Sequence, residues 1–373
     1  MDVIEEVAGI VLSKRLVPLL DRARIYACGI TPYDVTHLGH AATFVWVDVL
    51  CRVLRLHGVE PELCRNVTDV DDVLDAAARR AGERSDTFAA VQQFEYERDM
   101  DALRVRVPEH EPRAHSYVRQ VVRLAQALIQ ARVAYQRGGT VYFRGHDMAR
   151  RANLPHDQAV RLAAEFGGWT DDPAKDDSLD VAVWQASGPG ETAWDSPWGQ
   201  GRPGWHAECV AMALSTFGVG VDVHTGGADL AFPHHAYHAA MAEALTGVVP
   251  YARAWLHVGT VHASGAKMAK SAGNLVLVRD LLNRYPTAAV RLMILDRPWA
   301  ASWEYQPGQL ERAAARVEEL YRAAGRVGSG DTSAPAQVRA LLQTDLDVPA
   351  AVAVAVETGG PCARMLITTL GLD

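Results

Sequence analysis

The sequence predicts an α/β fold built on a parallel sheet, with a helical insertion and a small helical region at the C-terminal end. A short apolar run, Ile25 to Cys28, is followed by a loop and then by an apolar-periodic helix from about Gly39 to His57. A second strand-like segment, residues 60–67, comes directly after that helix. Strand, helix and strand in this order are typical of a βαβ unit with parallel strands.

Length and composition set the expected division of the chain. The 373 residues are 49% hydrophobic and 22% charged, enough for one large domain with a smaller appendage. We expect an α/β domain over residues 1–290, with an inserted region over about 84–200, and a C-terminal helical domain over 291–373. Residues 84–135 have the apolar spacing of helices, and GGTVYFRG is typical of a hairpin strand.

The charge balance and the N-terminal residues argue against nucleic acid and membrane partners. A net charge of −8 provides no general attraction to nucleic acid. The first residues, MDVIEEVAGIVLSKR, are acidic where a signal peptide is basic, and no apolar run reaches about eighteen residues. The five cysteines are widely spaced, which is not the pattern of a disulfide framework. We therefore expect a cytoplasmic protein that does not bind membranes.

The loop before the first helix carries the tetrapeptide His37-Leu38-Gly39-His40. The free N–H groups and the positive dipole end of a helix N-terminus favour a phosphate, so two imidazoles face one anion site. Gly39 is expected to let a nucleotide approach the backbone closely. A pattern of four residues recurs by chance, however, and ordinary core or surface histidines are the alternative interpretation. A second motif has to decide.

That second motif is Lys267-Met268-Ala269-Lys270-Ser271. It contains two of only four lysines in a chain that has 33 arginines. A solvated charged segment is the ordinary alternative, but this chain would be expected to use arginine in such a segment. Lysine carries a compact ammonium on a flexible stem, which suits a group that follows a moving triphosphate. We therefore predict a nucleotide-binding lysine loop.

Cys28, Cys209 and His234 are candidate metal ligands, because Zn²⁺ prefers thiolates and imidazoles. Three ligands leave one tetrahedral position open, which is the arrangement of a catalytic or substrate-binding zinc. The spacing lacks a short CxxC signature, so buried unpaired cysteines and a surface histidine cluster remain alternatives. His238 lies on the same predicted helix face as His234 and is a candidate further ligand, whereas His235 is expected to point elsewhere.

A family resemblance rests on five separate motifs in order: CGITPYDVTHLGHA, NVTDVDD, GRPGWHAEC, GGADLAFPHH and KMAKSAGNLVLV. They resemble cysteinyl-tRNA synthetases, which are class I aminoacyl-tRNA synthetases, and more closely their shortened relatives, the cysteine ligases of mycothiol biosynthesis. The segment Glu165 to Trp169 also resembles the start of an ERGGDP element of those ligases. The resemblance implies a class I synthetase Rossmann-like catalytic domain in an ATP-dependent, AMP-forming enzyme. Such an enzyme activates L-cysteine as cysteinyl-AMP and transfers it to the amine of glucosaminyl-inositol.

The resemblance also implies roles for individual residues. Zinc is held by Cys28, Cys209 and His234, and its open position takes the thiolate of substrate cysteine. ATP enters with Mg²⁺, and the charge that develops as pyrophosphate leaves is stabilised by His37, His40, Lys267 and Lys270. The cysteine pocket and the adenylate contacts comprise Cys28, Gly29, Ile30, Thr31, Thr43, Asn66, Val67, Thr68, Trp205, His224, Gly227, Ala228, Asp229 and Val261. Asp34 and Asp229 are the candidates for the base that deprotonates the acceptor amine.

Alternatives to this activity stay open. They are a cysteine ligase that acts on another amine in a natural-product pathway, a truncated cysteinyl-tRNA synthetase, and an inactive cysteine or nucleotide sensor. Ala269 stands where the family usually has serine, and His224 is closer to the tRNA enzymes. Residues 291–373 contain eight basic and ten acidic side chains, with no basic stripe for phosphate neutralisation. We therefore expect small-molecule partners and no tRNA, and we also expect a monomer.

Overall fold

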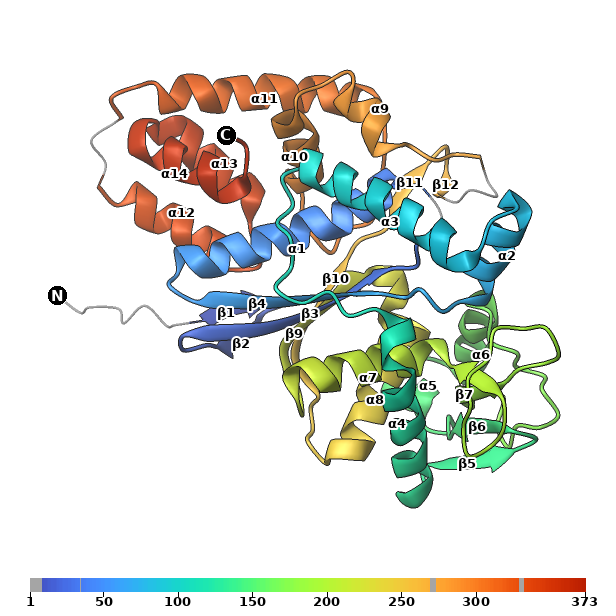
Figure 1. Cartoon of the computed structure of the whole chain (residues 1–373). Helices are drawn as coiled ribbons and strands as arrows, with labels where there is room; N and C mark the ends of the chain where they lie inside the picture. The colour runs from blue at the N-terminus through green and yellow to red at the C-terminus, as the bar shows by residue number, and fades with distance from the viewer. Residues whose placement is uncertain (1–8, 34, 269–272, 329–331) are drawn as a thin grey trace.

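The central sheet has four parallel strands in the order β10-β9-β3-β4 (Figure 1). The computed structural model describes residues 9–33, 35–268, 273–328 and 332–373. The strands are β3 (Arg22–Ile30), β4 (Glu60–Val67), β9 (Val221–Gly227) and β10 (Ala252–Val258). Helix α1 (Leu38–Leu56) connects β3 to β4, so the predicted βαβ unit is confirmed. The strand order reverses between β3 and β9, the place where open α/β sheets bind ligands.

Strand β3 contributes to two hydrophobic cores because its side chains alternate between the faces of the sheet. Ile25 and Ala27 pack into the core that contains α1. Tyr26 and Cys28 belong to the other core, which contains residues of α7 (Trp205–Phe217). Cys28 therefore lies on the α7 side of the sheet, directly before the loop that leads to α1.

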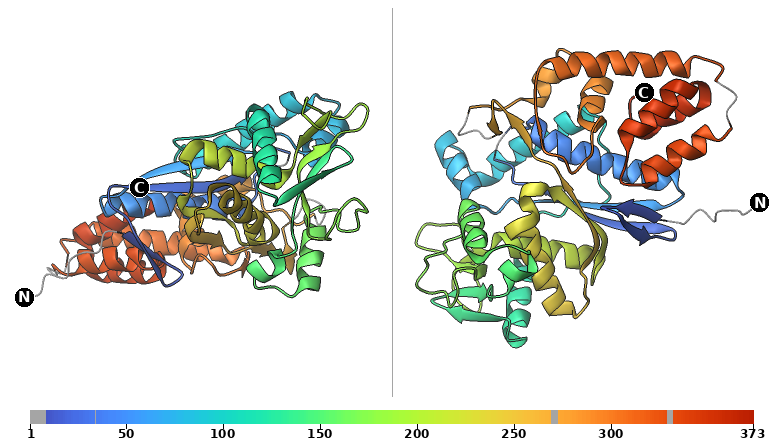
Figure 2. Two further views of the ribbon diagram at one scale, coloured as in Figure 1. Left: turned by 90° about the horizontal axis from the view of Figure 1, so that it is seen from below. Right: turned by 180° about the vertical axis from the view of Figure 1, so that it is seen from behind.

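Helices cover both faces of the sheet (Figures 1 and 2). Helix α1 covers one face and is backed by α10 (Thr287–Leu295), α11 (Gly308–Ala324), α12 (Ala334–Gln343), α13 (Val348–Thr358) and α14 (Gly360–Leu370). The other face is covered by α7, α8 (Ala236–Thr246) and α4 (Val118–Gln130). Periodicity does not reveal α13, because its alanines and valines leave no polar face to mark a helical repeat.

The residues between β4 and α7 form helices and a second, antiparallel sheet with the strand order β5-β6-β7-β8. The predicted hairpin is confirmed, since β5 (Ala134–Arg137) pairs with β6 (Thr140–Phe143). The other elements here are α2 (Asp72–Ala81), α3 (Ser85–Ala102), η1 (Ala114–Tyr117), α5 (Met148–Arg151), α6 (His156–Glu165), β7 (Val181–Ala186) and β8 (Gly201–Pro203). The domain limits given above stay predictions.

Smaller elements complete the fold. They are the hairpin β1 (Gly9–Leu12) and β2 (Arg15–Pro18), a small sheet of β11 (Val261–Ala263), β12 (Ala266–Lys267) and β13 (Trp303–Glu304), the turns η2 (Ala228–Leu230) and η3 (Ala231–His235), and α9 (Val278–Leu282). None of the described helices combines the length and the apolar character needed to cross a membrane.

A buried ion pair ties the sheet-covering helix to the C-terminal helices. The Arg291 guanidinium on α10 is fully buried and lies 2.7 Å from Asp48 of α1. It also donates to the carbonyls of Leu370 on α14 (2.9 Å) and Leu103 (2.8 Å). The charge is therefore both paired and hydrogen-bonded, which is what burial of an ion requires.

We predict that Asp48→Ala lowers the free energy of unfolding by about 3–5 kcal/mol, because it leaves Arg291 buried without its counter-charge. Urea unfolding followed by circular dichroism measures the change. The control is Asp86→Ala, which removes the solvent-exposed partner of Arg84 and should leave the midpoint unchanged. Equal effects of the two substitutions would contradict the structural role given to Asp48.

Candidate active site

Three of the predicted metal ligands come together from three different elements. Cys28 is near the end of β3, Cys209 is in the second turn of α7, and His234 is in η3, the turn that precedes α8. One ligand atom from each residue lies within 4.8 Å of the others, and all three side chains are buried. Two thiols and one imidazole in this arrangement could hold a metal ion and leave a coordination position for another ligand.

The electrostatics of this triad fit a bound cation. Burial raises the pKa of the Cys28 thiol well above its usual value, and the hydrogen bond with Cys209 and the charge of a Cys209 thiolate raise it further. Two thiolates therefore cannot coexist here without compensation. A metal ion reverses this effect, because a coordinated thiol loses its proton.

Neighbouring aromatic side chains hold the imidazole ligand in place. His206 Nδ1 lies 2.9 Å from His234 Nδ1, which leaves Nε2 of His234 as the ring nitrogen available to a metal. Trp205 stacks on the His234 ring with the centroids 4.3 Å apart. Such contacts to the second nitrogen fix the tautomer and the orientation of a metal-binding histidine. His206 is absent from the predicted set, although it lies beside Trp205 in the GRPGWHAEC motif.

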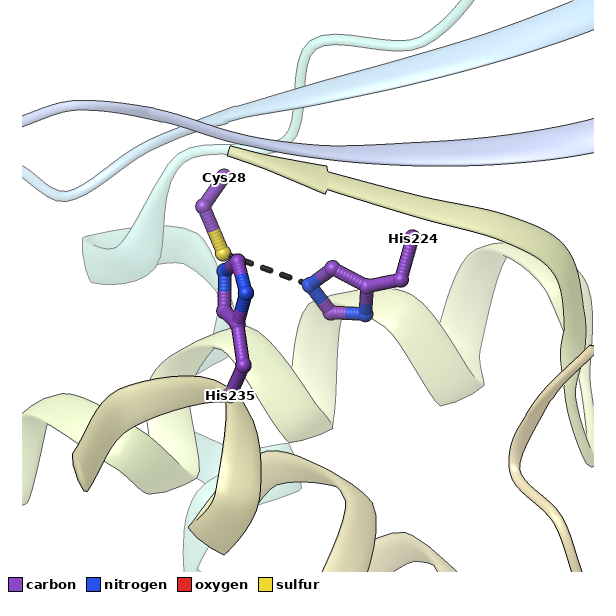
Figure 3. Close-up of side chains that lie close together, drawn as sticks. All are labelled: Cys28, His224 and His235. Carbon is purple, nitrogen blue, oxygen red and sulfur yellow. Dashed lines mark hydrogen bonds between the residues drawn. The ribbon is translucent and has the colours of Figure 1, made fainter. Parts of the chain in front are cut away.

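A second cluster of potential ligands shares Cys28 with the first (Figure 3). His224 and His235 point toward Cys28 from β9 and η3, and Cys28 Sγ is 3.5 Å from His224 Nε2. The expectation that His235 points elsewhere is therefore wrong. The physical reason is that His234 and His235 lie in a π-helical turn, not in the regular helix that follows it.

Charge decides between the two clusters. A divalent cation is neutralised by the two thiolates of Cys28 and Cys209, whereas the cluster with His224 and His235 offers only one thiolate. Burial of an uncompensated charge is costly, so the Cys28, Cys209 and His234 cluster is the better metal site. His238 is buried and stacks on Tyr251, but it belongs to neither cluster of the described residues.

The HLGH tetrapeptide opens α1 as predicted. His37 is the N-cap, and its Nδ1 accepts a hydrogen bond of 3.1 Å from the Gly39 N–H. The rings of His37 and His40 stack with their centroids 3.9 Å apart. Burial, with smaller contributions from His37 and Lys267, lowers the pKa of His40 to about 3. His40 is therefore neutral at physiological pH and acts as a hydrogen-bonding group rather than as a cation.

The structure gives Gly39 a role beyond the one expected for it. A Cβ at this position would lie 2.9 Å from Cε1 and 3.0 Å from Nδ1 of the His37 ring. The glycine is therefore needed for the His37 cap to form. Whether it also admits a nucleotide stays a prediction.

Several predicted adenylate contacts meet at the carboxyl ends of the parallel strands. The Gly29 N–H donates to Asn66 Oδ1 (3.0 Å), and Asn66 Nδ2 donates to Thr68 Oγ1 (3.0 Å). A Cβ on Gly227 would lie 4.0 Å from Thr43 Oγ1, which brings the end of β9 close to α1. These polar groups from β3, β4, β9 and α1 therefore lie together at the carboxyl edge of the central sheet.

Other predicted contacts can act only through their backbone. Ile30, Val67 and Val261 have buried side chains, so a ligand could reach these residues only through backbone groups, and the Val67 N–H already donates to the Pro112 carbonyl (2.9 Å). Thr31 follows directly after β3 and is half-buried. Val261 lies on β11, outside the central sheet, and no described hydrogen bond links it to the other predicted contacts.

The lysine loop reaches the end of β9 through one of its lysines. Lys267 Nζ lies 2.5 Å from Oδ2 of Asp229, the residue that follows Ala228. The same Nζ lies 5.7 Å from the centre of the Phe166 ring. The two charged side chains are 52% and 33% exposed, so their pairing contributes little and is easily broken. Lys270, Ala269 and Asp34 lie outside the described residues, and their predicted roles stay predictions.

Comparison with known families agrees with this arrangement. A family model described as the tRNA synthetases class I (C) catalytic domain matches residues 17–315. The chain belongs to this family. The structure of this class I synthetase is similar to that of Mycobacterium tuberculosis methionyl-tRNA synthetase in complex with methionyl-adenylate. The TM-score is 0.64 with 16% identity, over 95% of this chain and 82% of that chain, which supports the predicted fold class.

Two curated relatives carry the name L-cysteine:1D-myo-inositol 2-amino-2-deoxy-α-D-glucopyranoside ligase. The protein from Acidothermus cellulolyticus is 42% identical over 349 residues, 92% of this synthetase and 86% of the relative. The protein from Streptomyces coelicolor is 42% identical over 337 residues, 89% of this synthetase and 82% of the relative. The predicted family is therefore confirmed, and the similarity extends over most of both chains.

We predict that Cys209→Ala weakens cobalt binding by more than the roughly 10–100-fold typical of a substitution outside the ligand set. It should also reduce the sulfur-to-cobalt charge-transfer absorption, because one of two thiolates is lost. Cobalt titration of metal-free protein measures both effects. Cys64→Ala is the matched control, since Cys64 is a buried cysteine outside both clusters of the described residues. Equal spectra for the two variants would contradict the ligand assignment.

Proposed function

We propose that this class I synthetase activates L-cysteine with ATP and joins it to the amine of glucosaminyl-inositol, the reaction of mycothiol biosynthesis. The relatives that carry the corresponding ligase name support the proposal by their 42% identity over most of both chains. The observation that carries it is the buried triad of two thiols and one imidazole beside the HLGH loop.

We propose that the triad holds one zinc ion and selects cysteine through sulfur. When bound, zinc would offer an open position to a substrate thiolate. Serine is a poor replacement for such a soft ligand, and the loss of one specific contact can give discrimination on the order of 10⁴. Trp205, Thr68 and His224 are assigned to the cysteine pocket around Cys28, on the basis of the resemblance and of the contacts described above.

The first step forms cysteinyl-AMP. The cysteine carboxylate attacks the α-phosphate of ATP, which enters with Mg²⁺, and pyrophosphate leaves. We assign the stabilisation of the developing charge to His37, His40, Lys267 and Lys270. The neutral His40 imidazole contributes as a hydrogen-bonding partner, so the two lysines supply the positive charge. The exposed pairing of Lys267 with Asp229 is weak enough to be exchanged for a phosphate contact.

The second step joins cysteine to the amino sugar. The neutral amine attacks the carbonyl carbon of cysteinyl-AMP, a C–N bond forms, and the C–O bond to the phosphate breaks to release AMP. The proton of the amine goes to a base. Asp229 is our candidate for that base because it lies at the end of β9 beside Lys267. Asp34 remains the other candidate from the sequence.

We further propose that the enzyme acts in the cytoplasm as a monomer and without tRNA. The acidic balance of residues 291–373 and the small-molecule ligase name of the relatives support the absence of tRNA, and the acidic N-terminal residues support the cytoplasmic location. These statements rest on the sequence and on the family.

The test is a pair of assays on the purified wild-type protein. We expect pyrophosphate exchange into ATP that depends on cysteine and not on serine, followed by AMP release when glucosaminyl-inositol is added. The same mixture with tRNA is expected to release no AMP.

Other outcomes identify the alternatives. Exchange without release by either acceptor would point to a different amine, and release with tRNA would make the chain a truncated cysteinyl-tRNA synthetase. The absence of cysteine-dependent exchange would reject the activity itself.

A further inference from the structure

A cavity of about 640 Å³ lies between the inserted region and the edge strand β10. Its walls come from α5 and α6 on one side, and from η3, α8 and β10 on the other. This volume is in the range that holds a ligand of drug size, which is larger than cysteine. The walls combine apolar and aromatic side chains, such as Leu162, Phe166 and Trp255, with a few charged groups.

The cavity adjoins both parts of the candidate active site. His235 lines it, and a ring nitrogen of His235 lies within 4.8 Å of Cys28 Sγ. Phe166 also lines it and stacks on Trp205, which in turn stacks on His234. Lys267 and Asp229, which belong to the predicted nucleotide contacts, line it as well. A molecule in the cavity is therefore next to the metal triad and next to the nucleotide edge.

The charged groups of the lining leave one carboxylate unpaired. Arg151 pairs with Glu243 at 2.5 Å, and Lys267 pairs with Asp229 at 2.5 Å. Glu165, at the end of α6, is exposed at the edge of this lining and has no hydrogen bond or ion pair with any described residue. The lining thus favours a cation over an anion, and the Phe166 ring already faces one ammonium group, that of Lys267.

Most of the predicted nucleotide contacts lie outside this cavity. The HLGH loop, Gly29, Thr31 and Asn66 do not line the cavity, and among the predicted nucleotide contacts that the structure describes only Ala228, Asp229 and Lys267 do.

We propose that this cavity binds the acceptor, an amino sugar of pseudo-disaccharide size, and that Glu165 recognises its ammonium group. The assignment rests on the proposed function, since it places the second substrate of that reaction. The aromatic walls pack against the apolar faces of the sugar rings, and Glu165 forms a charge-assisted hydrogen bond to the amine before it is deprotonated.

The test separates acceptor binding from cysteine activation. In Glu165→Gln we expect the KM for glucosaminyl-inositol to rise about ten-fold, as for the loss of one charged hydrogen bond, while cysteine-dependent pyrophosphate exchange stays unchanged. Asp157→Asn is the matched control, because Asp157 is an exposed acid on the same helix and does not line the cavity. It should change neither measurement.

A second variant fills the cavity without changing charge. Ala239→Leu on α8 should abolish ligation and retain exchange, and the retained exchange also shows that the variant is folded. Ala164→Leu on α6 is the control, since Ala164 does not line the cavity, and it should retain both activities. Parallel loss of exchange and ligation in Glu165→Gln would instead assign the cavity to cysteine or ATP. Unchanged kinetics in both Glu165→Gln and Ala239→Leu would show that the cavity does not bind the acceptor. Failure of exchange in the wild type would instead reject the proposed function itself.

Discussion

The close approach of two thiols and an imidazole, all three buried, is the constraint on which the rest of the structure depends. Burial removes the Cys28 thiolate from water and so raises the pKa of this thiol, and repulsion by a Cys209 thiolate at this separation raises it further. A divalent cation relieves both effects, since two thiolates neutralise its charge. The second cluster, which offers only one thiolate, does not provide this balance.

The fold serves this site through the alternation of β3. Cys28 faces α7, and the loop after β3 leads to α1. The candidate metal ligands and the predicted nucleotide contacts are therefore joined by a single strand and its loop. His206 and Trp205 then hold the His234 ring from the far side. Lys267 of the lysine loop contacts Asp229, just after the end of β9, through a weak and exposed ion pair. The candidate metal ligands and the lysine predicted to bind phosphate thus lie on different elements.

Parts of this arrangement were accessible from the sequence alone. Local periodicity predicts the βαβ unit and the hairpin, because both depend on residues that are near one another in the chain. The candidate metal ligands Cys28, Cys209 and His234 are far apart in sequence. Their residue types alone are compatible with a zinc site, but only the family resemblance assigns these three residues to the same ion. His235 was placed wrongly because periodicity assumes a regular helix where the chain forms a π-turn. Neither the His206 contact nor the 640 Å³ cavity leaves a periodic signal, since both arise from packing between distant elements.

The central claim is that a metal ion held by Cys28, Cys209 and His234 recognises cysteine through its sulfur. X-ray absorption at the zinc edge of the zinc-loaded protein, with and without cysteine, tests it most directly. The account predicts two sulfur ligands per zinc in the free protein and three after cysteine is added, with no such change on addition of serine. An unchanged sulfur count with saturating cysteine would contradict it.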